Sequence, residues 1–192
     1  MTQIKTLPGL WLISDARNDA GLARALTRLP RGSGFIYRHY HLPDPERFCR
    51  FRQLRRIAQA RGHRVILADS ALTARAWGAD GIYGSPRSLY PRRAGLIHLA
   101  TAHDLAELGL AARLGADAAL LSPVFPTRSH PGAAVLGPVR FRLLARQARV
   151  PVIALGGMNA QRARTLGWNR WAAIDAFVTI PHSRCEILAR AT

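Results

Sequence analysis

Short apolar runs alternate along this chain with longer segments in which apolar residues recur at helical spacing. Such alternation is typical of repeated strand–helix units, because the strands of a parallel sheet are buried on both faces and each crossover helix on one. The pattern predicts eight strands: 10–14, 34–37, 64–68, 81–83, 96–100, 119–122, 152–155 and 175–179. It predicts helices over 20–29, 44–61, 72–77, 103–114, 138–149, 159–167 and 183–190, with a shorter link near 86–92.

Eight such units with no obvious edge strand predict an α/β fold, closed into a compact (β/α)8 TIM barrel. The chain has 192 residues, fewer than the roughly 250 typical of this fold, so some helices must be short. The segments "WGADG" (77–81) and "LGADA" (113–117) each close a helix and precede a strand, which supports repeated units. An open doubly wound sheet is the alternative, although no strand is followed by its G-x-G-x-x-G turn. No linker interrupts the alternation, so we expect a single domain over 1–192.

The charge balance is strongly basic, with 28 basic residues against 11 acidic ones and a net charge of +17. Such a field attracts phosphate groups, so nucleic acid is one candidate partner. The arginines are scattered through helices and do not alternate with aromatic residues, which argues against a stacking nucleic-acid module. Lys5 is the only lysine. Because it lies far from any strand end, a Schiff-base mechanism is disfavoured.

The cysteines and the apolar runs of the chain bear on its cellular location. Cys49 and Cys185 each lie in a helical pattern without metal-ligand spacing, so we expect structural thiols. No apolar run approaches the roughly 18 residues of a membrane span, and the first residues lack the features of a signal peptide. These patterns predict a soluble cytoplasmic protein that does not bind membranes, with homo-oligomerisation left open.

In a parallel barrel the chemistry gathers where the strands end, because all strands point the same way. Gly156 and Gly157 follow the seventh strand and precede a helix, so the backbone N–H groups there can approach a ligand. Together with the turn after the eighth strand they predict a phosphate site, and the alternative is a plain tight turn. The candidate strand-end residues are Asp15, Arg38, His39, His41, Asp69, Thr101, His103, Thr127, Ser129, His130, Gly156, Gly157 and Thr179.

Three segments, "RVILADSALTARAWGADGIY", "SPVFPTRSHPG" and "VPVIALGGMN", resemble in order and spacing the thiamine-phosphate synthase superfamily, which includes the TenI-like thiazole tautomerases. The resemblance covers roughly 10–179 and is tightest over 103–158. It implies a (β/α)8 barrel, a role in thiamine biosynthesis, and thiazole phosphate or thiamine phosphate as ligand. A synthase would join a pyrimidine pyrophosphate to thiazole phosphate, with Mg²⁺ neutralising the departing pyrophosphate.

The chain departs from the synthase pattern around the pyrophosphate. It keeps Arg38 and the metal ligand Asp69, although Asp69 can equally cap the helix that starts near Ser70. Mg²⁺ usually needs one or two carboxylates together with phosphate oxygens. Of the two metal carboxylates that the resemblance implies, only Asp69 remains, so half of the Mg²⁺ site is lost. The replaced positions are Ile36 for Gln, Tyr40 for Lys, Ala68 for Asn, Ser88 for the second metal carboxylate and His130 for the loop lysine.

The thiazole side is better preserved, which favours a TenI-like tautomerase or product-binding protein. In those tautomerases a histidine in a Ser-x-His motif moves a proton, and His103 holds that position with Thr101 in place of the serine. Imidazole suits the role, because it accepts and donates protons near neutral pH. The resemblance also implies ligand binding by Arg38 and by Thr127, Ser129, His130, Gly156, Gly157 and Thr179. A working synthase is the alternative, and a barrel reused for another phosphorylated ligand or nucleic acid is the third.

Overall fold

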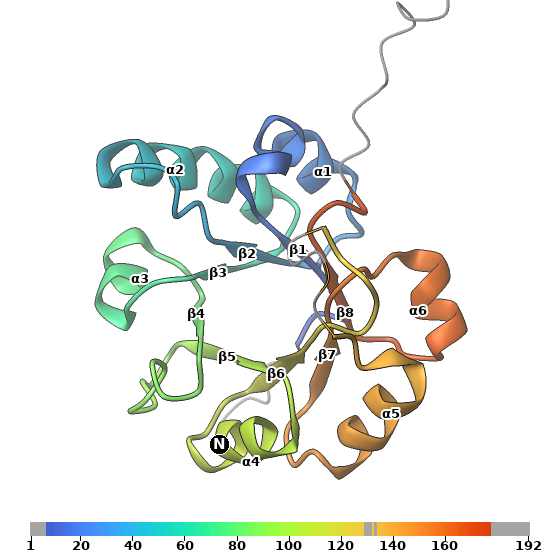
Figure 1. Cartoon of the computed structure of the whole chain (residues 1–192). Helices are drawn as coiled ribbons and strands as arrows, with labels where there is room; N and C mark the ends of the chain where they lie inside the picture. Colours follow the sequence, from blue (N-terminus) through green and yellow to red (C-terminus); the bar gives the residue numbers. More distant parts are fainter. Residues whose placement is uncertain (1–6, 129–131, 133, 178–192) are drawn as a thin grey trace, which may run out of the picture.

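The computed structural model describes residues 7–128, 132 and 134–177. In this part of the chain eight parallel strands close into a barrel in sequence order, with β1 hydrogen-bonded to both β2 and β8 (Figure 1). The barrel prediction is confirmed, and the open-sheet alternative is wrong. The strands are β1 Leu10–Ile13, β2 Gly34–Tyr37, β3 Arg64–Leu67, β4 Gly81–Gly84, β5 Ile97–Ala102, β6 Ala118–Leu121, β7 Val152–Ala154 and β8 Trp171–Ala173.

Short helices surround the barrel, as the chain length predicts. Three of them, α1, α3 and α6, have seven residues each. Between β4 and β5 the chain forms only a turn, in agreement with the predicted short link. The predicted helix over 183–190 lies outside the described residues. The helices are η1 Ala16–Gly21, a 3₁₀ helix, and α1 Leu22–Arg28, α2 Asp44–Ala60, α3 Ala71–Trp77, α4 Leu105–Arg113, α5 Gly137–Gln147 and α6 Ala160–Leu166.

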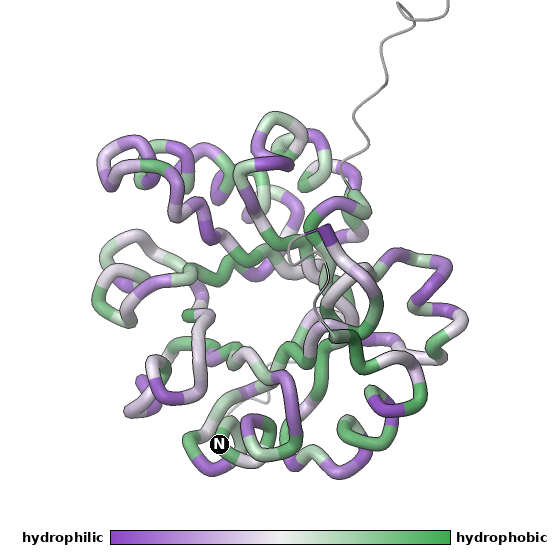
Figure 2. Tube along the Cα trace, viewed as in Figure 1, coloured by the Kyte–Doolittle hydropathy of each residue, from purple (hydrophilic) through white to green (hydrophobic). Residues whose placement is uncertain are grey.

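Strand alternation divides the core into two layers. Trp11 and Ile13 of β1 pack with inward residues of the other strands inside the barrel, whereas Leu12 packs in the layer between strands and helices. Figure 2 shows this as hydrophobic strands at the centre and hydrophilic outer helix faces. At Gly34 a side chain would overlap the indole ring of Trp11, so only glycine lets β2 lie beside it.

The two G-A-D segments play equivalent roles, one between β3 and β4 and the other between β5 and β6. The carboxylate of Asp80 accepts the backbone N–H of Val65 at 2.8 Å, and that of Asp117 accepts the N–H of His98 at 2.8 Å. Each aspartate therefore ties the start of its own strand to the strand before it. The interpretation of these segments as matching parts of repeated units agrees with this geometry.

The eighth strand differs from its prediction. It spans Trp171–Ala173 and pairs with β1 through Leu10↔Trp171 and Trp11↔Ala172, whereas residues 175–177 form a bend and turn. The segment "DAFVT" (175–179) has the stronger β-propensity, but it is Ala172 that lies opposite Trp11 inside the barrel. Phe177 instead stacks on Trp171, with ring centroids 5.2 Å apart.

No helix in the described ranges is long and apolar enough to cross a membrane.

A buried histidine makes stability depend on pH. His63 is 4% exposed, its Nε2 bonds the Leu26 carbonyl, and its Nδ1 has no partner in the structure. Burial lowers the pKa of His63 below 6.5. The unfolded chain therefore takes up a proton more readily, and stability that is full above about pH 6.5 falls as the pH drops below it. Burial also lowers the pKa of His39 and His98.

We expect the melting temperature to fall between about pH 7.5 and pH 5.5, the range that spans histidine titration. A His63→Gln variant keeps a donor for the Leu26 carbonyl but cannot titrate. Its melting temperature should fall less over the same range, as measured by thermal unfolding in matched buffers. An equal fall in both proteins would contradict the assignment to His63.

Candidate active site

A cavity of about 620 Å³ opens where the strands end. Its lining comes from β4, β5 and β8 and from the segments that follow β2, β5, β6, β7 and β8. Six of the residues predicted from the sequence meet there: Arg38, Thr101, His103, Thr127, Gly156 and Gly157. The structure therefore brings these six residues together, although Arg38 and Gly157 are far apart along the chain.

The Gly-Gly turn is built so that only glycine fits. Gly156 has φ +95° and Gly157 has φ +60°, in the left-handed region that other residues rarely adopt. A Cβ on Gly156 would lie 2.6 Å from the Cα of Pro123, and one on Gly157 would overlap the carbonyl of Pro126. Within the described ranges no acceptor takes the backbone amides of Gly157 and Met158. The turn is tight, and it also leaves N–H groups available at the cavity.

Arg38 is held at the cavity by the residues that follow β1. Its Nε donates to the Ser14 carbonyl at 3.1 Å and its Nη2 to the Asp15 carboxylate at 3.0 Å. The backbone N–H of Arg38 donates to the Ser14 hydroxyl at 2.8 Å. A guanidinium fixed in this way is suited to bind an anion without reorganising.

His39 is buried next to Ser14, the residue that binds Arg38. It is 1% exposed, does not line the cavity, and has φ +35°. Its Nδ1 lies 2.8 Å from the Ser14 hydroxyl and its Nε2 lies 2.6 Å from Asp19 Oδ1. Burial lowers the pKa of His39, opposed mainly by the hydrogen bond to Asp19. The neutral imidazole therefore has a structural role, and His41 lies beside it with ring centroids 4.9 Å apart.

Asp69 does not line the cavity. Its Oδ2 accepts a hydrogen bond from the buried Arg47 guanidinium at 2.6 Å, and its Oδ1 accepts the backbone N–H of Ser70. Burial alone would raise the pKa of Asp69, but the bonds from Arg47, Ser70 and Thr73 outweigh it and lower the pKa. The N-cap of α3 is Ser70, whose hydroxyl accepts the N–H of Thr73, so the interpretation of Asp69 as the cap is wrong.

The donor set does not fit a two-carboxylate Mg²⁺ site. Asp69 is committed to Arg47, and the position of the second carboxylate holds Ser88, whose hydroxyl bonds the carbonyl of Ser85 at 2.9 Å. The described residues contain no group of three or more His, Cys, Asp or Glu side chains that could hold a metal ion. Hard divalent cations bind through such oxygen clusters.

Sequence reasoning missed Tyr83 and Asp175, which also line the cavity. Tyr83 ends the predicted fourth strand and is 9% exposed. Burial raises its pKa, so the phenol stays protonated and can donate a hydrogen bond. Its inward position follows from strand alternation with Gly81 and could have been predicted. Asp175 was missed because it was placed inside a strand.

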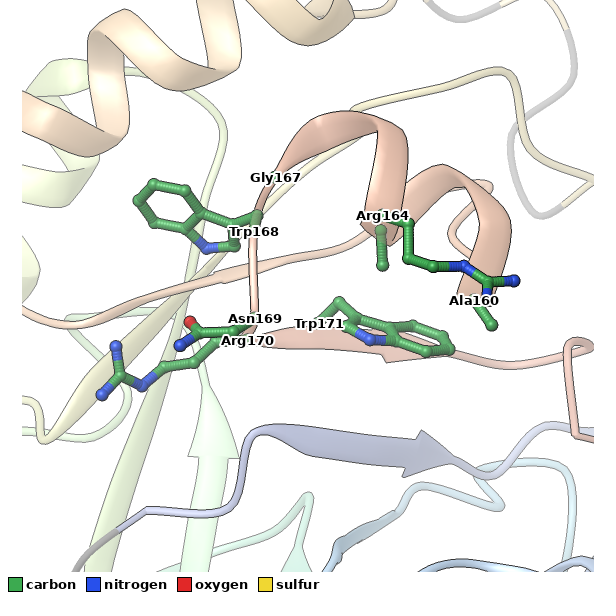
Figure 3. Close-up of a pocket in the computed structure, with 8 residues that line it drawn as sticks. Ala160, Arg164, Gly167, Trp168, Asn169, Arg170 and Trp171 are labelled. Atoms are coloured by element: carbon green, nitrogen blue, oxygen red, sulfur yellow. The ribbon is translucent and has the colours of Figure 1, made fainter.

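Three candidate residues, Ser129, His130 and Thr179, lie outside the described residues. A second pocket, shown in Figure 3, lies between α6 and the start of β8 and is lined by Arg164, Trp168, Arg170 and Trp171 among others. It contains none of the strand-end candidates. The cavity after the strands is therefore the candidate active site.

The closed parallel topology defines a (β/α)8 barrel protein, and the cavity places its candidate site at the carboxyl ends of the strands. The family model described as thiamine monophosphate synthase (TMP-TENI) matches residues 10–177. The chain therefore belongs to the thiamine monophosphate synthase family.

Individual relatives agree with this assignment. A thiamine-phosphate synthase of Azoarcus sp. (strain BH72) is 32% identical over 170 residues, which cover 82% of this chain and 82% of the relative. A thiamine-phosphate synthase of Geobacillus thermodenitrificans (strain NG80-2) is 29% identical over 161 residues, 79% of this chain and 73% of the relative. The solved structure of thiamine phosphate pyrophosphorylase from Pyrococcus furiosus superposes with a TM-score of 0.77 at 25% identity, covering 96% and 93% of the two chains.

Proposed function

We propose that this protein binds thiazole phosphate in the cavity at the carboxyl ends of the strands and acts as a TenI-like thiazole tautomerase. The observation that carries the proposal is a contrast within one site. The Gly156–Gly157 turn leaves its amides available, and His103 lines the same cavity, whereas Asp69 is engaged by Arg47 outside it.

The phosphate would be held by backbone amides near Gly157 and by the hydroxyl of Thr127. Backbone N–H groups and nearby hydroxyls are the usual phosphate donors at a barrel mouth. Arg38 would attract the anion and orient it, since its guanidinium is fixed by Ser14 and Asp15. The tautomerisation moves one proton and makes the thiazole ring aromatic, so the reaction needs a group that accepts and returns a proton. His103 is suited to that role.

A working thiamine-phosphate synthase is the second candidate. Relatives named as thiamine-phosphate synthases cover about four fifths of the chain, which favours it. Charge builds on the pyrophosphate as its bond to the pyrimidine breaks, and arginine can bind phosphate oxygens in place of a metal. Arg38 and the nearby Arg128, which both line the cavity, would have to provide this stabilisation.

A binding screen separates the two candidates. Purified protein is titrated by calorimetry with thiazole phosphate, thiamine phosphate and the pyrimidine pyrophosphate, each with and without Mg²⁺. The tautomerase predicts that thiazole phosphate binds with an affinity independent of Mg²⁺. Binding of the pyrimidine pyrophosphate that requires Mg²⁺ would favour the synthase.

We expect synthase turnover to be absent, or at least about a hundredfold below that of a working enzyme, because one main electrostatic contact with the leaving group is worth that factor. Thiamine phosphate formation from both substrates is measured with and without Mg²⁺, alongside a metal-dependent synthase assayed under the same conditions. Brisk, Mg²⁺-dependent formation of thiamine phosphate would overturn the proposed function and establish the synthase.

A further inference from the structure

The imidazole of His103 has a carboxylate partner on α4, the helix that begins two residues after it. Glu107 lies four residues further along, in the first turn of α4, and its Oε2 is 2.9 Å from His103 Nδ1. The same oxygen accepts the backbone N–H of His103 at 2.7 Å. Two bonds to one carboxylate oxygen fix both the backbone and the ring of His103.

Glu107 also takes part in the start of the helix through its backbone. Asp104 is the N-cap residue of α4, and its side chain accepts the backbone N–H of Glu107 at 2.8 Å. Glu107 in turn points back across the first turn to His103. The arrangement resembles a capping box, in which side chains satisfy the free amides of a helix start. The Glu107 carboxylate therefore serves both the helix start and the imidazole, through bonds that do not involve the Asp104 side chain.

The chemistry of the pair decides which ring nitrogen is available. An ionised carboxylate only accepts hydrogen bonds, so Nδ1 must carry the proton in the bond to Glu107. A neutral imidazole carries one proton, which leaves a lone pair on Nε2. His103 lines the cavity, whereas Glu107 does not.

We propose that Glu107 is a positioning residue that holds His103 in the Nδ1–H tautomer, with Nε2 as the basic nitrogen at the cavity. The proposal rests on the proposed function only in giving His103 a proton to move. A surface pair of this kind contributes little to stability, since both side chains are well exposed, at 60% and 43%. Its consequence is the choice of tautomer and the orientation of the ring.

The test reads the tautomer directly. Long-range ¹H–¹⁵N correlation spectra of histidine-labelled protein are recorded at about pH 8.5, where an ordinary imidazole is neutral. The His103 signals are assigned by their loss in His103→Asn. We expect Nδ1 to be protonated and Nε2 to carry the lone pair in the unmodified protein. In Glu107→Ala we expect both tautomers, because the ring has lost its acceptor.

Two variants separate positioning from helix stability. Glu107→Gln keeps an oxygen that can accept the Nδ1 proton, so the tautomer should be retained. Asp104→Ala removes the other half of the helix start and leaves the Glu107–His103 pair, so it should lower the melting temperature without changing the tautomer. Unchanged His103 spectra in Glu107→Ala, or an Nε2–H tautomer in the unmodified protein, would overturn the proposal.

Activity provides the second measurement. For conversion of the non-aromatic thiazole precursor we expect kcat to fall at least about tenfold in Glu107→Ala, less than the full contribution of an acid–base group because the imidazole remains, with KM little changed. Glu107→Gln and Asp104→Ala should keep most of the turnover. An inactive unmodified protein with the expected spectra would contradict the proposed function alone. Full turnover and unchanged spectra in Glu107→Ala would contradict the positioning role alone.

Discussion

Replacing Gly157 by alanine is expected to weaken thiazole-phosphate binding by about a hundredfold or more. The residue has φ +60°, and an added Cβ would overlap the Pro126 carbonyl and lie 2.9 Å from the Cβ of Phe125. The turn must move to accommodate the methyl group, which displaces its backbone amides from their places at the cavity. Hydrogen bonds to a charged group contribute about 1.5–3 kcal/mol each. Losing two of them would weaken binding by about a hundredfold or more.

Gly95→Ala is the matched control for the glycine prediction. Gly95 has φ +81°, but a Cβ there would meet nothing within 4 Å, and the residue does not line the cavity. Both variants carry left-handed strain of about 1–2 kcal/mol, whereas only Gly157→Ala disturbs the ligand site. Calorimetric titration with thiazole phosphate measures the affinity, and thermal unfolding measures the strain. Equal affinity in Gly157→Ala and the unmodified protein would exclude the turn as the phosphate site.

The barrel could be predicted because its signal is repeated. Each strand contributes a short buried run and each helix a longer amphipathic one, so eight weak signals support a single topology. The end of the chain shows the limit of this reasoning. "DAFVT" has more β-branched and aromatic character than "WAA", yet β8 is the latter, and its Ala172 lies opposite Trp11 inside the barrel. Pairing and packing against a distant strand are not reported by local propensity.

The candidate site could likewise be predicted only in part. Positions after strands follow from topology, so Arg38, Thr101, His103 and the Gly-Gly turn could be placed at one end of the barrel from the sequence alone. The hydrogen-bond partners of the side chains could not be predicted. Nothing in the local sequence pairs Asp69 with Arg47, which lies 22 positions earlier on α2. Such a contact depends on how α2 packs against the ends of β2 and β3, and it removes Asp69 from the cavity.

His103→Ala is expected to lower turnover of the thiazole precursor by about 10²–10⁴-fold, the usual contribution of a positioned acid–base group. The reaction itself only moves a proton, so little rate enhancement should remain once the imidazole is gone. Binding should change less, because the phosphate donors lie on the turn after β7 and the loop after β6, whereas His103 follows β5. The effect should therefore appear in kcat rather than in the dissociation constant of thiazole phosphate.

His103→Asn sharpens the interpretation of that loss. Asparagine keeps a side-chain donor for Glu107 and most of the volume, but it cannot accept and return a proton at neutral pH. It should bind thiazole phosphate as the unmodified protein does and be as slow as the alanine variant. His41→Ala is the control, since His41 is exposed and does not line the cavity. A positioned acid–base group contributes far more than about threefold to the rate. If the turnover of His103→Asn were within about threefold of that of the unmodified protein, the proton transfer would belong to another residue. Tyr83 would then be the next candidate, because it lines the same cavity.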